Sequence, residues 1–179
     1  MALTVREMAP EELDLRIDYF LNASADYLRT LGVAPDLLAP REKWRADCRE
    51  EMARPITERR ILFLIWLAGD DPVGFSTADH ITFGVEAKMH LHVLRPEDRR
   101  QGVGLAGAKA SAAYYFDRLK VQRLICEPNA FNTGPHRTLQ RAGFTFEKTY
   151  VTTPGPINFE QPVTRWVLER GAAGSLVEN

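Results

Sequence analysis

Two glycines separated by one residue, Gly102 and Gly104, lie between an apolar run at 89–94 and a long alanine-rich segment that ends near Lys120. The apolar run has the composition of a strand, and apolar residues from Leu105 to Leu119 recur at helical spacing. Glycine lets the backbone turn tightly and leaves its N–H groups open to close approach. The sequence therefore predicts a strand, a glycine loop and a helix, and the rest of the fold must accommodate this unit.

The start of the predicted helix is suited to bind an anion. The first amides of a helix have no intrahelical acceptor, and the helix dipole favours negative charge there. Arg99 and Arg100 directly precede the loop and would add positive charge at its rim. We expect a phosphate or pyrophosphate, although the loop alone is also compatible with a tight turn that binds nothing.

Two other nucleotide-binding motifs fit less well. Residues 102–107 have the spacing G-x-G-x-x-G, but a dinucleotide fold has this loop after its first strand and an acidic residue at the end of the next one. Here the loop falls mid-chain, and Asp117 lies inside the predicted helix. No Gly-Lys-Ser or Gly-Lys-Thr triplet follows the glycines, so a Walker loop is excluded. We expect a loop that holds an anion without transferring a phosphoryl group.

Composition indicates one globular domain. With 45% hydrophobic residues and 23 basic against 24 acidic side chains, the chain can bury a core and has no basic block for extended nucleic-acid binding. No segment resembles a signal peptide or a membrane span. Cys48 and Cys126 form no C-x-x-C pair, which favours a reducing cytoplasm. We expect a single domain over residues 1–170 and a loose tail at 171–179.

Turn signals and apolar periodicity predict the remaining elements. A strand at 3–8 precedes an amphipathic helix that begins near Pro10 and continues to Gly32, and a charged helix covers 41–52. Strands follow at 61–67, 73–78 and 88–94, with a continuation of the second at 81–83. After the central helix come a strand at 123–127, a helix that ends at Gly143, and strands at 144–152 and 163–168. This order predicts an α/β (α+β) fold with a mixed central β-sheet and helices on both faces.

Three segments together resemble one protein family. Arg99-x-x-Gly102-x-Gly104, after a strand and before a helix, is similar to the pyrophosphate loop of the GNAT superfamily of acetyl-CoA-dependent N-acetyltransferases. Residues 127–132, Glu-Pro-Asn-Ala-Phe-Asn, and residues 139–144, which end in Gly-Phe, are similar to the next strand and helix of that superfamily. The resemblance covers residues 89–144 and implies a GNAT-like single domain, since linked motifs at the expected separation are more specific than one.

The resemblance also implies how acetyl-CoA would bind. The amides of the glycine loop would hold the pyrophosphate, the strand end at Leu94 would pair with the pantetheine arm, and Asn132 would contact that arm. Asparagine at that position is equally suited to cap the following helix. The implied cofactor contacts are Leu94, Arg99, Arg100, Gln101, Gly102, Val103, Gly104, Leu105 and Asn132.

Two residues are candidates for the general base that accepts the proton of the amine. Glu127 stands at a strand end, where the resemblance places the glutamate base of ribosomal-protein acetyltransferases. His90, twelve residues before Gly102, matches the histidine of siderophore-type lysine acyltransferases and shares one face of its strand with His92. A salt-bridged glutamate and a hydrogen-bonded sheet histidine are the structural alternatives. The pair His90-x-His92 has no evident third ligand for a metal, so no metal site is expected.

One position departs from the family pattern. Many members carry a tyrosine seven residues after the asparagine, as the acid that protonates the leaving thiolate, and Leu139 stands there in this chain. Tyr150, His136 or water could supply that proton, and the thiolate could also leave unassisted. Neither cysteine has the setting of a nucleophile, which favours direct transfer in a ternary complex.

The sequence thus predicts an acyltransferase that moves acetyl from acetyl-CoA to a primary amine of a small molecule or a peptide. The loop at 152–162 and the aromatic residues Tyr19, Tyr27 and Trp44 are expected to wall the acceptor site. Leu139 keeps open the alternative of a non-catalytic acyl-CoA-binding or sensing module. Neither a nucleic-acid nor a membrane partner is expected, and a homodimer paired through sheet edges is compatible with such a fold.

Overall fold

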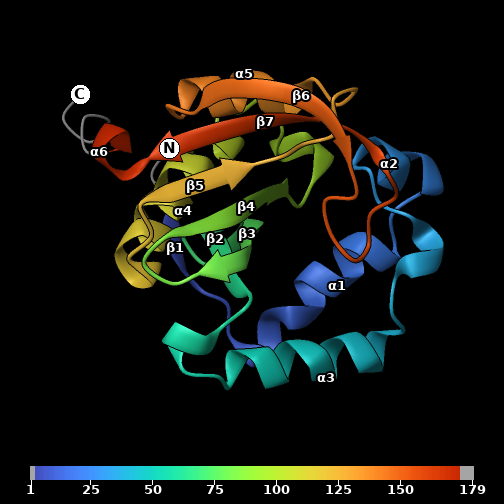
Figure 1. Ribbon diagram of the computed structural model, residues 1–179. Helices are drawn as coiled ribbons and strands as arrows, with labels where there is room; N and C mark the ends of the chain where they lie inside the picture. Colours follow the sequence, from blue (N-terminus) through green and yellow to red (C-terminus); the bar gives the residue numbers. More distant parts are fainter. Residues whose placement is uncertain (1–2, 174–179) are drawn as a thin grey trace.

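The computed structural model describes residues 3–173, which form one domain around a seven-stranded mixed sheet (Figure 1). Its strands are β1 (Thr4–Glu7), β2 (Leu62–Ala68), β3 (Asp71–Thr82), β4 (Glu86–Val93), β5 (Arg123–Cys126), β6 (Thr145–Thr152) and β7 (Gln161–Glu169). In space they follow the order β1-β2-β3-β4-β5-β7-β6. Neighbouring strands pair antiparallel except β4 and β5, which run parallel.

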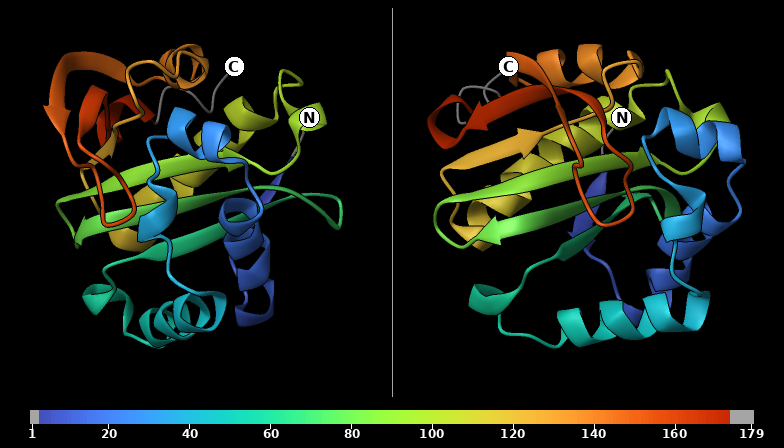
Figure 2. Two further views of the ribbon diagram at one scale, coloured as in Figure 1. Left: turned by 90° about the vertical axis from the view of Figure 1, so that its right-hand side faces the viewer. Right: turned by 45° about the vertical axis from the view of Figure 1, so that its right-hand side comes forward.

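Helices cover both faces of this sheet, as the views in Figure 2 show. The main helices are α1 (Leu13–Leu21), α2 (Ala25–Thr30), α3 (Arg41–Met52), α4 (Val103–Leu119), α5 (Gly134–Arg141) and α6 (Arg170–Ala173), with 3₁₀ turns η1 (Pro10–Glu12), η2 (Pro35–Leu37), η3 (Ile56–Glu58) and η4 (Pro96–Asp98). α1 and α3 share one core cluster, and α4 and α5 share another. The predicted fold class is confirmed. Within residues 3–173, no helix is long and apolar enough to cross a membrane.

The strand β2 is buried on both sides, which explains the continuous apolar run in its sequence. Leu62 and Leu64 pack into the cluster beneath α4, whereas Phe63 and Ile65 pack against α1 and α3. Alternate residues of a strand point to opposite faces, so a strand covered on both faces needs apolar residues throughout.

Close packing against Trp66 of β2 holds α4 in place. A Cβ atom at Gly107 would lie 2.5 Å from ring atoms of Trp66, so glycine is needed for the helix to approach this closely. Trp66 Nε1 also donates a hydrogen bond to Ser111 Oγ at 2.8 Å. These contacts fix the first half of α4, and with it the glycine loop, relative to the sheet.

The predicted continuous helix from Pro10 to Gly32 is wrong, because the chain breaks between α1 and α2. Ser24 adopts an extended backbone conformation, and its Oγ accepts a hydrogen bond from Tyr27 N, which starts a new helix. The loose tail predicted from 171 is also corrected at its start, since Arg170–Ala173 forms α6. The rest of that tail, 174–179, lies outside the described residues.

The parallel pair β4 and β5 is short. Its register joins Glu86 with Arg123, Ala87 with Leu124 and Lys88 with Ile125, and it ends there. β4 nevertheless continues along β3 to Val93. The sheet therefore opens between its fourth and fifth positions, and the candidate site lies in this opening.

Candidate active site

The opening between β4 and β5 contains a cavity of about 670 Å³. Both predicted catalytic residues, His90 and Glu127, line it, together with Asn132 and Leu139. Further walls come from α1, from β3 and from the segment 154–158 before β7. Of the three aromatic residues expected to wall the acceptor site, Trp44 lines this cavity, whereas Tyr19 and Tyr27 are not among its lining residues.

The glycine loop presents a row of backbone N–H groups without acceptors. Arg100 and Gly102 have φ values of 64° and 86°, and α4 begins at Val103. Ala106 N donates to Gly102 O, but the amides of residues 101–105 have no acceptor within the described part of the chain. These donors stand at the start of a 17-residue helix, where an anion is favoured.

Gly104 keeps space beside these amides. An added Cβ would make only ordinary contacts with Val93 Cγ2 at 3.7 Å and Thr138 Cγ2 at 4.0 Å, so packing within the protein does not require glycine there. A ligand that approaches the backbone would require it. The loop thus offers an anion both hydrogen-bond donors and space.

The two arginines before the loop have different surroundings. Arg99 lies over the ring of Tyr27, with Cζ 4.8 Å from the centroid, and donates to Tyr27 Oη at 2.6 Å. Tyr27 Oη lies 2.6 Å from Tyr19 Oη, which is 3.3 Å from His92 Nδ1. Arg99 therefore links the loop to α1, α2 and β4, whereas the side chain of Arg100 is exposed at the rim.

Leu94, at the end of β4, uses its amide to pair with β3. Its N–H donates to Val73 O at 3.0 Å. Backbone groups of successive residues in an antiparallel pair point alternately toward and away from the partner. The register of β3 and β4 therefore directs the backbone groups of Leu91 and Val93 away from β3 and into the opening.

Asn132 is not the cap residue of α5. The cap position is Thr133, which makes no side-chain capping bond, and α5 begins at Gly134. Asn132 donates its own amide to Asn129 O at 3.0 Å. Its half-buried side chain lines the cavity, where it is free to contact a ligand.

Glu127 follows β5 and is the centre of a buried charged cluster. Lys88 Nζ lies 2.7 Å from Oε2, Arg165 Nη1 lies 2.9 Å from Oε1, and the hydroxyl of Tyr150 donates to Oε1. Burial raises the pKa of this carboxyl, but these three partners outweigh burial and hold the pKa below its ordinary value. Glu127 is therefore ionised at neutral pH and is a weak proton acceptor.

His90 pairs with Asp79 across β3 and β4. Its Nε2 lies 3.1 Å from Asp79 Oδ2, and His80 Nδ1 lies 2.8 Å from Asp79 Oδ1. A register shift between Asp79 and Thr82, with φ 47° at His80, accompanies this arrangement. Burial lowers the pKa of His90, but the charge and hydrogen bond of Asp79 raise it above the ordinary value of histidine.

His92 lies in a different environment from His90, although both line the cavity. Its ring stacks on Phe75 with centroids 4.7 Å apart. Burial, followed by the charges of His90, Arg16 and Arg99, lowers the pKa of His92 well below the ordinary value. His92 is therefore neutral at physiological pH.

The residue at the usual position of the general acid and its two possible substitutes have different surroundings. Leu139 is buried in the core at 2% exposure. His136 Nε2 lies 3.0 Å from Thr164 Oγ1, and burial lowers its pKa. Tyr150 contacts Glu127, and burial together with that carboxylate raises the pKa of its hydroxyl.

Several residues around the cavity were not identified from the sequence. Asp79 could have been found as an acidic residue between two strand segments of one predicted strand. Lys88 and Arg165 carry no local signal, because they meet Glu127 only in the folded sheet. Arg16 lies on the face of α1 that its helical spacing makes apolar, and a basic residue there is a signal.

A family model described as an acetyltransferase (GNAT) domain matches residues 43–152. This match covers more than half of the chain, which belongs to the GNAT acetyltransferases. The protein is accordingly an acetyl-CoA-dependent N-acetyltransferase, as the resemblance of its motifs predicted.

Solved structures share this fold at low sequence identity. The aminoglycoside acetyltransferase AAC(6')-Ib in complex with coenzyme A has a TM-score of 0.73 and 17% identity, over 99% of this chain and 100% of that one. Spermidine N-acetyltransferase from Vibrio cholerae, with coenzyme A and spermine, has a TM-score of 0.76 and 16% identity, over 96% and 97%. RimL, a ribosomal L7/L12 α-N-protein acetyltransferase, has a TM-score of 0.76 and 14% identity, over 96% of each chain. No curated protein sequence matches the chain significantly.

Proposed function

We propose that the protein transfers acetyl directly to a primary amine of a small molecule or peptide, with His90 as the general base. The observation that carries this proposal is the Asp79–His90 pair in the wall of the cavity that Glu127 and Asn132 also line. Asp79 would orient the ring of His90 and stabilise the imidazolium that forms when the amine loses its proton.

In this proposal, acetyl-CoA is held mainly by backbone groups. Acetyl-CoA supplies an activated acetyl group as a thioester. The amides of residues 101–105 would hold its pyrophosphate, with Arg100 at the rim and Arg99 keeping the loop in position. At the end of β4, next to Leu94, the backbone groups of Leu91 and Val93 would pair with the pantetheine arm, which Asn132 would also contact.

Glu127 remains the second candidate for proton transfer. The register of β4 and β5, continued past Lys88 and Ile125, brings Glu127 level with His90 on the other side of the opening. Its carboxylate would balance the charges of Lys88 and Arg165 beside the base. Water, or the Tyr150 hydroxyl that contacts Glu127, would protonate the leaving thiolate.

Direct transfer is favoured over an acyl-enzyme by the state of Cys126. This cysteine lines the cavity, but burial and the neighbouring Glu127 strongly raise the pKa of its thiol. A protonated thiol is a poor nucleophile. Cys126→Ala should therefore retain most of the turnover, and intact-mass measurement should find no acetylated intermediate on the wild-type protein.

A panel of amines, with thiol release from acetyl-CoA as the readout, tests the proposal. We expect release that depends on an amine, and a loss of about 100-fold or more in kcat for His90→Gln with little change in the Kd of acetyl-CoA. The missing tyrosine at Leu139 favours one rival, a non-catalytic acyl-CoA-binding or sensing module. Slow thioester hydrolysis without any acceptor across the panel would support that rival.

We also propose a cytoplasmic location and a homodimer paired through sheet edges. The cytoplasm is consistent with two buried, unbridged cysteines, Cys48 and Cys126.

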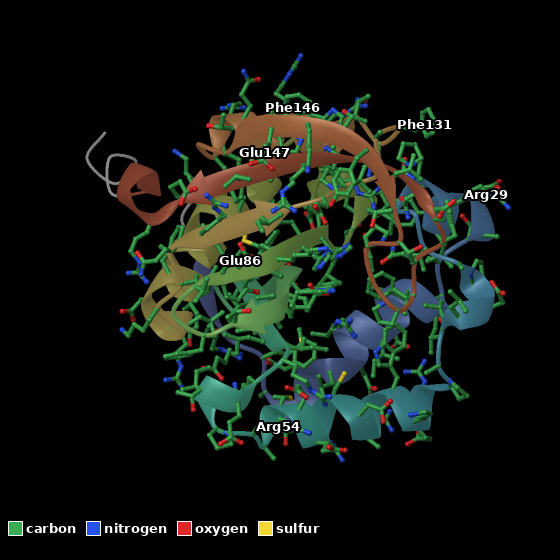
Figure 3. The ribbon with its side chains drawn as sticks, in the orientation of Figure 1. Arg29, Arg54, Glu86, Phe131, Phe146 and Glu147 are labelled. Atoms are coloured by element: carbon green, nitrogen blue, oxygen red, sulfur yellow. The ribbon has the colours of Figure 1, made fainter. Side chains whose placement is uncertain are left out.

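β6 is an outer strand of the sheet and exposes Phe146, labelled in Figure 3, and Val151. Light scattering coupled to size-exclusion chromatography would distinguish a dimer from a monomer, and Phe146→Lys should weaken a dimer formed through β6.

A further inference from the structure

Arg16 is a buried cation in the wall of the cavity. It lies on α1, and 9% of the residue is exposed. Its guanidinium carbon is 5.0 Å from the ring centroid of Trp44, 5.2 Å from that of Phe63 and 5.6 Å from that of Phe20. Aromatic faces attract a cation but do not neutralise its charge.

Arg16 forms no ion pair or hydrogen bond within residues 3–173, and the charge of Asp79 acts on it only from beyond ion-pair distance. Its Nε and Nη1 atoms are enclosed and have no hydrogen-bond acceptor there. Other arginines on the same side of the sheet are paired, as Arg45 is with Asp14 and Arg60 with Glu51. Because a buried charge is costly unless a partner offsets it, Arg16 calls for an anion in direct contact, which the described residues do not provide.

The carboxylates of the cavity already have direct contacts within the protein. Asp79 contacts both His80 and His90. Glu127 contacts both Lys88 and Arg165. Among the described charged residues that line this cavity, Arg16 is therefore the one without a direct partner.

We infer that the acceptor is a primary amine that also carries a carboxylate, which Arg16 binds while the amine lies at His90. This inference rests on the proposed function and adds the class of acceptor to it. Nη2 is the guanidinium nitrogen that is not among the enclosed atoms, and its N–H group can donate a charge-assisted hydrogen bond to a carboxylate. Both residues line one cavity, so the two ends of one small molecule can reach them.

The same arrangement selects against purely cationic acceptors. A diamine bound with one nitrogen at His90 would bring its second ammonium group toward Arg16, whose charge would repel it. A carboxylate at that end would instead be attracted. Arg16 is thus a specificity-determining residue for the acceptor and has no part in the proton transfer itself.

Matched acceptors test this inference in the thiol-release assay. The panel contains ω-amino acids from glycine to 6-aminohexanoate, alkylamines of the same chain lengths, and the corresponding diamines. We expect kcat/KM for the best amino acid to exceed that of its alkylamine by at least about tenfold, mainly through KM. Wild-type protein that uses alkylamines or diamines as well as the amino acids would overturn the inference and leave the proposed function intact.

Two variants test whether Arg16 causes the preference for amino acids. Arg16→Met keeps the length of the side chain without its charge and should remove the preference by lowering kcat/KM for amino acids alone. Arg60→Gln is the control, because Arg60 also lines the cavity but pairs with Glu51 and has a side chain that is 71% exposed. A retained stabilisation by acetyl-CoA would show that each variant is folded. If Arg16→Met is not folded, Arg16→Lys retains the charge without the planar fork and should reduce the preference partially.

A binding measurement separates this inference from the proposed function. In the presence of coenzyme A, calorimetry would compare 5-acetamidopentanoate with N-pentylacetamide, which has no carboxylate. Tighter binding of the charged amide that is lost in Arg16→Met would support the carboxylate site even if no amine were acetylated, a result that would overturn the proposed function alone. Equal binding of both amides would overturn the carboxylate site.

Discussion

Two carboxylates that line one cavity, the buried Glu127 and the half-buried Asp79, have opposite consequences for proton transfer. Glu127 is held by Lys88, Arg165 and Tyr150, which stabilise its ionised form and leave it little affinity for a proton. The carboxylate of Asp79 instead lies beside the ring of His90, and its negative charge raises the pKa of that imidazole. The proposed base is therefore His90, whereas the carboxylate of Glu127 balances the charges of Lys88 and Arg165.

The pH dependence of turnover tests the role of Asp79. His90 must be neutral to accept a proton, so kcat/KM should rise with pH through a pKa above the ordinary value of histidine. Asp79→Asn removes the charge that raises this pKa, and the rising limb should move to lower pH while the plateau falls. Profiles of both proteins from about pH 5 to 9 would show the shift. A limb that stays in place would exclude Asp79 as the partner of the base.

Glu127→Gln should lower turnover by about tenfold or more and leave the affinity for acetyl-CoA near that of the wild type. The amide cannot balance Lys88 and Arg165, and it removes the negative charge at the cavity. The measurements are steady-state kinetics and calorimetry with acetyl-CoA. Glu147→Gln is the control, since Glu147 also pairs with Arg165 but its side chain is 47% exposed. Unchanged turnover would remove Glu127 from the mechanism.

In the proposed function, acetyl-CoA binds at the glycine loop together with the start of α4. The free amides of this loop are fixed to the sheet by the contact of Gly107 with Trp66. Acetyl-CoA should raise the melting temperature, because a ligand that binds only the folded state stabilises it, by about 2.7 kcal/mol at 100 times its Kd. The loop is therefore both the recognition element and a reporter of binding.

Gly104→Glu should abolish this thermal shift. The new carboxylate would lie among the amides of residues 101–105 and exclude a pyrophosphate by both charge and volume. Ala113→Glu places the same charge on an exposed position of the same helix and should retain the full shift. A shift that persists in Gly104→Glu would contradict the assignment of the loop.

At the level of elements, the sequence was most informative where the signal is local. Gly143 ends α5 with φ 91°, and Phe144 N donates to Leu139 O, as expected for a glycine after a helix. The sequence likewise predicts the hairpin turn between β2 and β3, where Gly69 has a φ of 64°. The break at Ser24 was missed because the apolar spacing continues past it, while the serine side chain competes for the amide of Tyr27.

The candidate site was only partly predictable, for a related reason. The loop, Asn132, Glu127 and His90 belong to motifs that lie within short stretches of sequence. Arg16 acquires its significance from Trp44 and Phe63, and Asp79 from His90, which are contacts between distant positions. The sequence can show that Arg16 and Asp79 are unusual at their positions, but no periodicity or spacing records which residues they contact.

For the whole molecule, the paired carboxylates predict sensitivity to acid. Four carboxyls have pKa values below their ordinary values: Glu7, Glu51, Asp79 and Glu127. Burial raises each of these pKa values, but neighbouring cations or histidines lower it by more than burial raises it. A carboxyl with a lowered pKa in the folded state adds stability above its unfolded pKa, and this stability is lost as the pH falls through the folded value. Urea midpoints should therefore decline below about pH 4.

The variant Glu127→Gln should show a lower midpoint at neutral pH and a shallower decline in acid, because one of these carboxyls no longer titrates. Wild-type midpoints that stay constant from neutral pH to pH 3 would contradict the stabilising role of these ion pairs.

The separation of β4 and β5 also bears on how the molecule behaves toward other proteins. A free strand edge on the outside of a sheet is a template for aggregation, and proteins usually protect such edges. Here the free edge at Leu91 and Val93 lies inside the sheet, between strands of the same chain. A slender molecule can enter and act as a short substitute strand, whereas the sheet of another protein has no way to dock there edge to edge. The fold thereby leaves the unpaired backbone groups of one strand open to a ligand without exposing them to edge-to-edge aggregation.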